Sequence, residues 1–272
     1  MRGMVSSQSP IGVFDSGLGG LSVLKELALA MPEENFIYLG DIARLPYGTK
    51  SQSVVSKYSL SCANFLVRQG AKALVVACNT ASALALPQLQ KTLKIPVMGV
   101  IEPGVKAALR LSGQTQENQI LVLATEGTVK SEAYLKEFKL QGFQETIKQI
   151  PCPLLVPLAE EGWFDHSITQ EVIETYLSPF GKTHRGIFLL GCTHYPLLEK
   201  SFKKVLGEKA FITHGARVLS QELKDLLAKG NLLNKSRQPR NLTFYSTDHI
   251  RSSLPILNAL FDREISFSVV DL

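Results

Sequence analysis

The chain has 272 residues and a mass of 29.9 kDa, which is enough for one large α/β domain or for two domains of ordinary size. Apolar residues make up 45% of the sequence and charged residues 19%, a composition that excludes intrinsic disorder. The net charge of +5 comes without a run of five basic residues, so no nucleic-acid partner is expected.

The four cysteines, Cys62, Cys78, Cys152 and Cys192, are too few for a disulfide-dense scaffold. They form no Cys-x-x-Cys pair, so no metal site is expected. The first ten residues lack the apolar core of a signal peptide, and no apolar segment approaches the roughly 20 residues of a membrane-spanning helix. We therefore expect a cytoplasmic protein without a membrane partner, in which the cysteines are thiols.

Short apolar segments alternate with longer segments of helical periodicity along the chain. Strands are expected at 11–14, 36–39, 73–77, 97–100, 120–124, 187–190, 211–213, 242–246 and 265–270. Helices are expected at 21–31, 51–69, 80–93, 105–111, 129–140, 169–177, from about 197, at 218–228 and at 249–260. A stretch with Pro151, Pro153 and Pro157 is expected to interrupt the alternation.

This alternation is typical of a parallel-sheet α/β fold, in which ligands bind at the carboxyl ends of the strands. Two segments share one plan: VVACNTA at 75–81 and LLGCTHYP at 189–196. Each is a buried strand followed by a cysteine and by polar residues that open a helix. They lie about one domain length apart. We interpret them as two halves of related plan, each presenting one thiol.

The sequence around these two cysteines favours chemistry over a purely structural role. A helix N-terminus stabilises a thiolate, so we expect the pKa of Cys78 to be lowered, although a buried core cysteine is the alternative. Cys192 has the same position, and His194 follows it; an imidazole there can hold a thiolate or move its proton. Cys62, in an amphipathic helix, and Cys152, between two prolines, are interpreted as structural.

Several loops that enter helices carry further candidates. In DSGLGG at 15–20, Asp15 lies at the end of a strand, where it either serves the site or makes an Asx-turn, and the glycines let the backbone approach a small anion such as a carboxylate. The turn LPYGTK at 45–50 exposes Tyr47, as binding loops often do. Two more loops supply residues that could equally be ordinary caps: Thr125, Thr128, Glu160 and Glu161.

Two thiols without a cofactor motif limit the chemistry. A disulfide oxidoreductase would carry Cys-x-x-Cys, and an enzyme with one nucleophilic thiol would leave the second cysteine unexplained. Inversion at an acidic carbon, by contrast, needs one base on each face of the carbon. The sequence therefore favours a two-base reaction with the substrate held between the two halves.

Five segments occur in an order that is similar to a known family. They are FDSGLGG (14–20), LPYGTK (45–50), VACNTASA (76–83), GVIEP (99–103) and LGCTHYPLL (190–198). Together they resemble the glutamate racemases, within the cofactor-independent aspartate/glutamate racemase family. The resemblance runs from about residue 11 to residue 214 and is weaker beyond.

The resemblance implies roles for individual residues. Cys78 is implied as the base for D-glutamate, assisted by Asp15, and Cys192 as the base for L-glutamate, assisted by His194. Glu160 is implied to line the pocket and orient the amino group, whereas Glu161 is not expected to take part. The implied substrate-binding positions are Asp15, Ser16, Pro46, Tyr47, Gly48, Asn79, Thr80, Thr125, Thr128, Thr193 and His194.

The resemblance also implies an architecture and a biological role. Two pseudo-symmetric α/β domains would enclose the active site in a cleft that closes on substrate, the first built from 1–100 and 212–272 and the second from 101–211. No cofactor, neither pyridoxal phosphate nor a metal, would be required. The product D-glutamate would supply peptidoglycan synthesis, with a peptidoglycan precursor as an activator and a homodimer as further options. A racemase for aspartate or another amino acid, or a non-catalytic glutamate-binding regulator, remains as an alternative.

Overall fold

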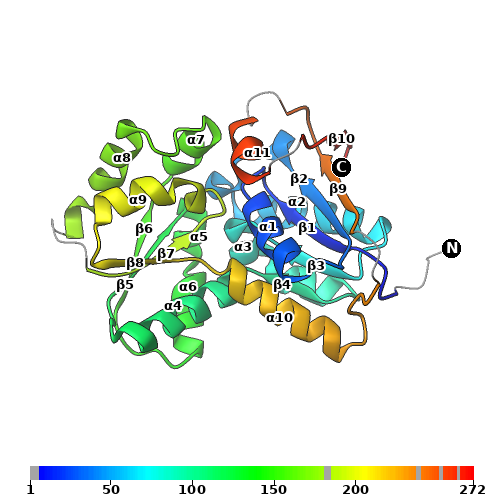
Figure 1. Cartoon of the computed structure of the whole chain (residues 1–272), viewed down its shortest axis with the longest axis horizontal. Helices are drawn as coiled ribbons and strands as arrows, with labels where there is room; N and C mark the ends of the chain where they lie inside the picture. The colour runs from blue at the N-terminus through cyan, green and yellow to red at the C-terminus, as the bar shows by residue number, and fades with distance from the viewer. Residues whose placement is uncertain (1–5, 181–184, 237–239, 251–253, 262–263) are drawn as a thin grey trace.

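The strands of the protein are short apolar segments, most of them buried on both faces, as parallel strands covered by helices must be. A computed structural model describes residues 6–180, 185–236, 240–250, 254–261 and 264–272 (Figure 1). Its strands form two separate sheets in which every pairing is parallel, so the expected α/β class is confirmed.

The two sheets take their strands from different parts of the chain. The first contains, in spatial order, β10 (Ser268–Val269), β9 (Leu242–Ser246), β2 (Phe36–Gly40), β1 (Ile11–Asp15), β3 (Ala73–Val76) and β4 (Val97–Gly99). The second contains β6 (Ile147–Pro151), β5 (Ile120–Ala124), β7 (Gly186–Gly191) and β8 (Ala210–Thr213). We call the parts of the molecule built on these sheets the first half and the second half.

Helices cover both faces of each sheet and bury its apolar side chains. In the first half, α1 (Leu21–Ala30) and α10 (Ala216–Lys229) cover one face, and α2 (Gln52–Arg68) and α3 (Asn79–Thr92) cover the other. In the second half, α4 (Ile101–Thr115) and α6 (Ala133–Leu140) lie opposite α7 (Leu155–Glu160), α8 (Ser167–Leu177) and α9 (Glu199–Leu206). The shorter elements are α5 (Glu126–Ser131), α11 (Leu254–Leu260), η1 (Ile42–Arg44), η2 (Tyr47–Thr49), η3 (Ser178–Phe180) and η4 (Tyr195–Leu198). Within the described ranges, no helix is long and apolar enough to span a membrane.

The chain crosses between the halves twice, and the two crossings lie side by side. It leaves the first sheet between β4 and α4, and it returns between β8 and α10. A Cβ atom on Gly215 would lie 2.5 Å from the backbone nitrogen of Gly104, so only glycine allows the returning chain to pack this closely on the outgoing one. Helix α10 then packs against both α1 and α4 (Figure 1).

The proline-rich stretch contains regular structure, so the expectation of an interruption is wrong. Pro151 ends β6, which is an edge strand, where a missing N–H is tolerated. Pro157 lies in the first turn of α7, where its N–H would have had no acceptor within the helix. For the same reason α4 begins at Ile101, earlier than expected, with Pro103 in its first turn.

The helix expected at 129–140 is two helices, α5 and α6, separated by Glu132 in a left-handed conformation. Other differences are at the C-terminal end. Of the helix expected at 249–260, residues 254–260 form α11, residues 249–250 are not helical, and residues 251–253 lie outside the described ranges. The last strand is β10, shorter than the expected 265–270. Boundaries of this kind depend on pairing with neighbouring strands, which periodicity alone does not reveal.

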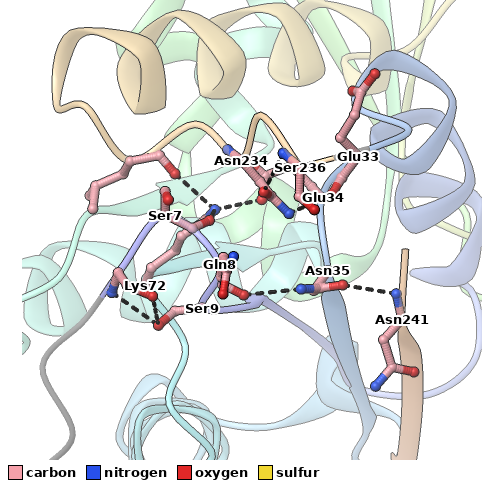
Figure 2. Close-up of polar contacts among 12 residues, drawn as sticks. Ser7, Gln8, Ser9, Glu33, Glu34, Asn35, Lys72, Asn234, Ser236 and Asn241 are labelled. Atoms are coloured by element: carbon pink, nitrogen blue, oxygen red, sulfur yellow. Dashed lines mark hydrogen bonds and ion pairs between the residues drawn. The ribbon is translucent and has the colours of Figure 1, made fainter. Parts of the chain in front are cut away.

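A buried lysine ties three distant segments together at the amino ends of the first sheet (Figure 2). Lys72, which precedes β3, is fully buried, and its Nζ donates to Glu34 Oε2 at 2.5 Å. The same ammonium donates to the carbonyl oxygens of Ser7 and Leu232, and Glu34 Oε1 accepts from the backbone N–H of Asn234. The segment that follows α10 is thereby fixed to the start of the sheet.

We expect Lys72→Met to lower the free energy of unfolding by about 3–5 kcal/mol, because Glu34 would remain buried without a cation. Lys130→Met is the matched control, since Lys130 pairs with Glu126 on the surface, and it should change stability by less than about 0.5 kcal/mol. Urea unfolding at neutral pH measures both. Equal losses in the two variants would contradict a special contribution of the buried pair.

Candidate active site

The two candidate cysteines occupy equivalent positions in the two halves. Cys78 is the N-cap of α3, just after β3, and its Sγ accepts from the backbone N–H of Ala81 at 3.4 Å. Cys192 directly follows β7. The two thiols, one from each half, line one cavity.

That cavity is small. Its volume is about 20 Å³, room for about one water molecule and far too small for an amino acid. Cys78 is 5% and Cys192 6% exposed, so both thiols are almost completely buried. The cavity is lined by Ser16, Leu45, Pro46, Tyr47, Gly48, Cys78, Asn79, Thr80, Thr125, Val156, Cys192, Thr193 and His194.

The structure therefore brings most of the sequence-predicted residues to one place. Three of them, Asp15, Thr128 and Glu160, do not line the cavity. Each is hydrogen-bonded to a residue that does: Asp15 to Thr193, Thr128 to Thr80 and Thr125, and Glu160 to His194. Val156 and Leu45 line it without having been singled out, and their apolar side chains gave no sequence signal for a site.

Asp15 ends β1 and is fully buried beneath the first thiol. Its Oδ2 accepts from the backbone N–H of Gly17 at 3.0 Å, which is the Asx-turn considered from the sequence, and its Oδ1 accepts from Thr193 Oγ at 3.3 Å. Burial raises the pKa of this carboxyl, and the nearby charge of His194 offsets only part of the rise. Asp15 thus joins the two halves and can exchange a proton at higher pH than an ordinary aspartate.

The pKa of Cys78 is raised, so the expectation that the helix N-terminus would lower it is wrong. Burial raises the pKa of the thiol, and the negative charge of Asp15 raises it further, to about 12. The N–H of Ala81 and the hydroxyl of Ser16, 3.5 Å from the sulfur, oppose this change without reversing it. In the closed site, loss of hydration outweighs the helix terminus, and Cys78 is a neutral thiol.

Cys192 lies at the end of a chain of polar groups. Its Sγ is 3.8 Å from Nδ1 of His194, and Nε2 of His194 is 3.1 Å from Oε1 of Glu160. Burial lowers the pKa of His194, but the hydrogen bonds with Cys192 and Glu160 and the charges of Cys192 and Asp15 raise it by more, to about 10. The protonated imidazole of His194 therefore lies between the sulfur of Cys192 and the carboxylate of Glu160.

The glycine-rich turn of the first half packs directly on the second cysteine loop. A Cβ atom on Gly19 would lie 2.6 Å from both Nδ1 of His194 and Oγ1 of Thr193. The sequence had suggested that the glycines of this turn admit a ligand, and at Gly19 the group that approaches is His194 instead. The Ser22 hydroxyl reinforces this contact by donating to the carbonyl of Thr193 at 3.1 Å.

Three threonine hydroxyls join the halves on another side of the cavity. Thr80 Oγ1 is 2.8 Å from Thr125 Oγ1 and 3.3 Å from Thr128 Oγ1, and the last two are 3.0 Å apart. Thr125 is also the N-cap of α5, which was the alternative to a role in the site. The same side chain therefore caps a helix and lines the cavity.

Tyr47 was expected to be exposed, and this is wrong: it is 1% exposed. Its hydroxyl donates to the buried carboxylate of Asp41, which also accepts from Arg44 Nε at 2.8 Å and Thr247 Oγ1 at 2.9 Å. Asp41, which no motif in the sequence singled out, holds the loop that carries Tyr47. A sequence signal for Asp41 was available: it directly follows β2, just as Asp15 ends the adjacent strand β1.

The other two cysteines, Cys62 and Cys152, are fully buried, in agreement with their interpretation as structural. Cys62 lies on α2 in the core of the first half, and Cys152 lies after β6 in the core of the second. In the described part of the chain, no group of three or more His, Cys, Asp or Glu side chains is placed to hold a metal ion.

Fold and site together define an α/β protein of two halves, each of which places one thiol in a shared buried cavity. The family model for Asp/Glu/Hydantoin racemases matches residues 11–220, and the chain belongs to this family. The resemblance seen in the sequence is thereby confirmed.

Named relatives extend the match over nearly the whole chain. The glutamate racemase of Geobacter metallireducens is 45% identical over 238 residues, which cover 88% of this chain and 87% of the relative. The solved glutamate racemase of Francisella tularensis, in complex with D-glutamate, is 37% identical and has a TM-score of 0.87, covering 97% of this chain and 98% of its own. The Escherichia coli glutamate racemase in complex with L-glutamate and the activator UDP-MurNAc-Ala is 26% identical, has a TM-score of 0.73, and covers 93% and 94% of the two chains.

We expect the raised pKa of His194 to make the stability of the protein depend on pH. The folded protein keeps a proton on His194 that the unfolded chain releases above its ordinary pKa of 6.5, so this contribution is complete below pH 6.5 and is lost as the pH rises towards about 10. His194→Gln removes it. Urea unfolding should therefore show a difference between wild type and variant that shrinks across this range, and a difference independent of pH would contradict the assignment.

Proposed function

We propose that this protein is a glutamate racemase, an isomerase that interconverts L- and D-glutamate by a two-base mechanism without a cofactor. The observation that carries the proposal is the pair of buried thiols, one from each half, that line one cavity. Inversion at Cα needs this arrangement, because the proton leaves one face and returns to the other. The named relatives support glutamate as the substrate.

The two cysteines would divide the proton transfers of this reaction between them. Starting from L-glutamate, the Cys192 thiolate would take the Cα proton, so that the Cα–H bond breaks and an S–H bond forms. Cys78, whose pKa of about 12 keeps it protonated, would then give its proton to the opposite face of the carbanion. The product is D-glutamate, with the thiol and the thiolate exchanged, and the reverse reaction begins from that state.

The neighbouring residues would support these transfers. Asp15, with its raised pKa, would help Cys78 to gain or lose a proton, and His194 would do the same for Cys192. Because Glu160 contacts Nε2 of His194 outside the cavity wall, we assign it to holding this imidazole, in place of the contact with the amino group that the resemblance implied. Removal of water strengthens every electrostatic contact with the carbanion.

The cavity must widen to admit substrate, since its volume holds no more than about one water molecule. We propose that the halves are two domains that move about the paired crossings at Gly104 and Gly215. The expected domains were 1–100 with 212–272, and 101–211. Because β8 pairs within the second sheet up to Thr213, we place the second boundary after that residue.

The proposed product has a use that fits the family. D-Glutamate would supply peptidoglycan synthesis, and a peptidoglycan precursor is a candidate activator, since the E. coli relative was solved with UDP-MurNAc-Ala under that description. The homodimer, the cytoplasmic location and the absence of a nucleic-acid partner stay predictions.

We expect Cys78→Ser and Cys192→Ser each to lower the racemisation rate by about 10²–10⁴-fold, because each removes one base. The assay follows the loss of optical activity from pure L- or D-glutamate without added cofactor, and solvent deuterium should appear at Cα. Cys152→Ala, which removes a buried thiol away from the cavity, is the matched control and should keep near wild-type activity.

Three results of this assay would contradict the proposal. Full racemisation by either serine variant would exclude the two-thiol mechanism. Faster turnover of aspartate than of glutamate would indicate the aspartate branch of the family. Binding of glutamate to the wild type without exchange of the Cα proton would indicate a regulator.

We expect D-glutamate to make the protein more compact in solution, because binding should hold closed a cleft that must open for entry. Small-angle X-ray scattering of the wild type should give a smaller radius of gyration with saturating D-glutamate than without it. Identical scattering curves would contradict domain closure.

A further inference from the structure

Tyr134, which no sequence motif singled out, connects the two halves beside both thiols. It lies on α6 in the second half and is 1% exposed. Its hydroxyl donates to Oδ1 of Asn79 at 2.7 Å. Asn79 belongs to the first half, directly follows Cys78 and lines the cavity. The contact therefore joins the second half to the residue next to the first thiol.

The ring of Tyr134 also packs on the loop of the second thiol. A Cβ atom on Gly191, the residue before Cys192, would lie 2.9 Å from Cε2 of the ring. A Cβ atom on Gly104 would lie 3.3 Å from Cε1 and from the hydroxyl oxygen. The ring is thus fixed against the backbone of two segments, and its hydroxyl has a defined position relative to Cys192.

The hydrogen bond to Tyr134 determines which end of the Asn79 amide is available. An amide has one acceptor oxygen and one donor NH₂ group. Burial raises the pKa of Tyr134, so its hydroxyl stays protonated and donates to the oxygen. Nδ2 of Asn79 has no acceptor among the residues that the structure describes, while the side chain lines the cavity. The donor end is therefore free for an anionic group of the substrate.

We propose that Tyr134 is a positioning residue for the reaction: it holds the Asn79 amide so that the NH₂ group donates to a carboxylate of the bound amino acid. The inference rests on the proposed function. Without the phenol hydroxyl, Oδ1 loses its donor and the amide can rotate. It then presents its oxygen to the carboxylate in part of the population, and substrate binding weakens.

The test is a double-mutant cycle on the racemisation of D-glutamate. Tyr134→Phe should raise KM about 10-fold, the equivalent of one hydrogen bond to a charged group. Asn79→Ala should raise KM at least as much. Because Tyr134 would act through Asn79, the double variant should be no worse than Asn79→Ala alone. A purely structural tyrosine would give additive losses, and a loss of folded protein would lower apparent kcat and leave KM unchanged.

Two further variants keep the test decisive. Asn79→Asp keeps the acceptor for Tyr134 but replaces the donor NH₂ with an oxygen, so its KM should also rise by about 10-fold or more. Tyr245→Phe, in β9 away from the cavity, is the control and should match the wild type. An unchanged KM in Tyr134→Phe or in Asn79→Asp would overturn the inference. If the wild type itself did not racemise glutamate, the proposed function would fail first.

Discussion

The site depends on one constraint: two thiols from separate sheets must share a space from which water is excluded. Loss of hydration raises the pKa of Cys78 despite its place at a helix N-terminus. To exclude water, the halves must also pack closely against each other, and small residues permit this at their boundary. Gly19 against His194 and Gly215 against Gly104 are two of the positions where a single Cβ atom would hold the halves apart.

The two cysteines lie in similar backbone settings, but their charged neighbours differ in sign. In each, a cysteine follows a buried strand and precedes a helical segment. Around Cys78 the dominant neighbour is an acid, Asp15, which disfavours the thiolate. Around Cys192 it is the protonated imidazole of His194. The proposed reaction takes a proton on one face and returns one on the other, so it needs one thiol and one thiolate at the start of each turnover.

Much of this could be predicted from the sequence, because apolar periodicity and strand–cysteine–helix plans are local signals. The fold class, most elements and the gathering of loops at strand ends follow from such signals. The failures lie where long-range contacts decide. Tyr47 packs in the core of the first half and donates to Asp41, which Thr247 contacts from a distant part of the chain. Strand β6 forms by pairing with β5 although it ends in Pro151. The pKa of Cys78 depends on how completely the opposite half covers it.

The buried contacts of Lys72 would give the proposed closing motion a fixed base. They tie the segment after α10 to Glu34 and to the start of β3, at the amino ends of the first sheet (Figure 2), whereas the cavity lies at the carboxyl ends. Loosening this segment would break the buried hydrogen bonds that Leu232 accepts from Lys72 and that Asn234 donates to Glu34. The proposed separation of the halves would therefore deform the two crossings instead, where Gly215 and Gly104 meet, and a small rotation there would uncover both thiols at once.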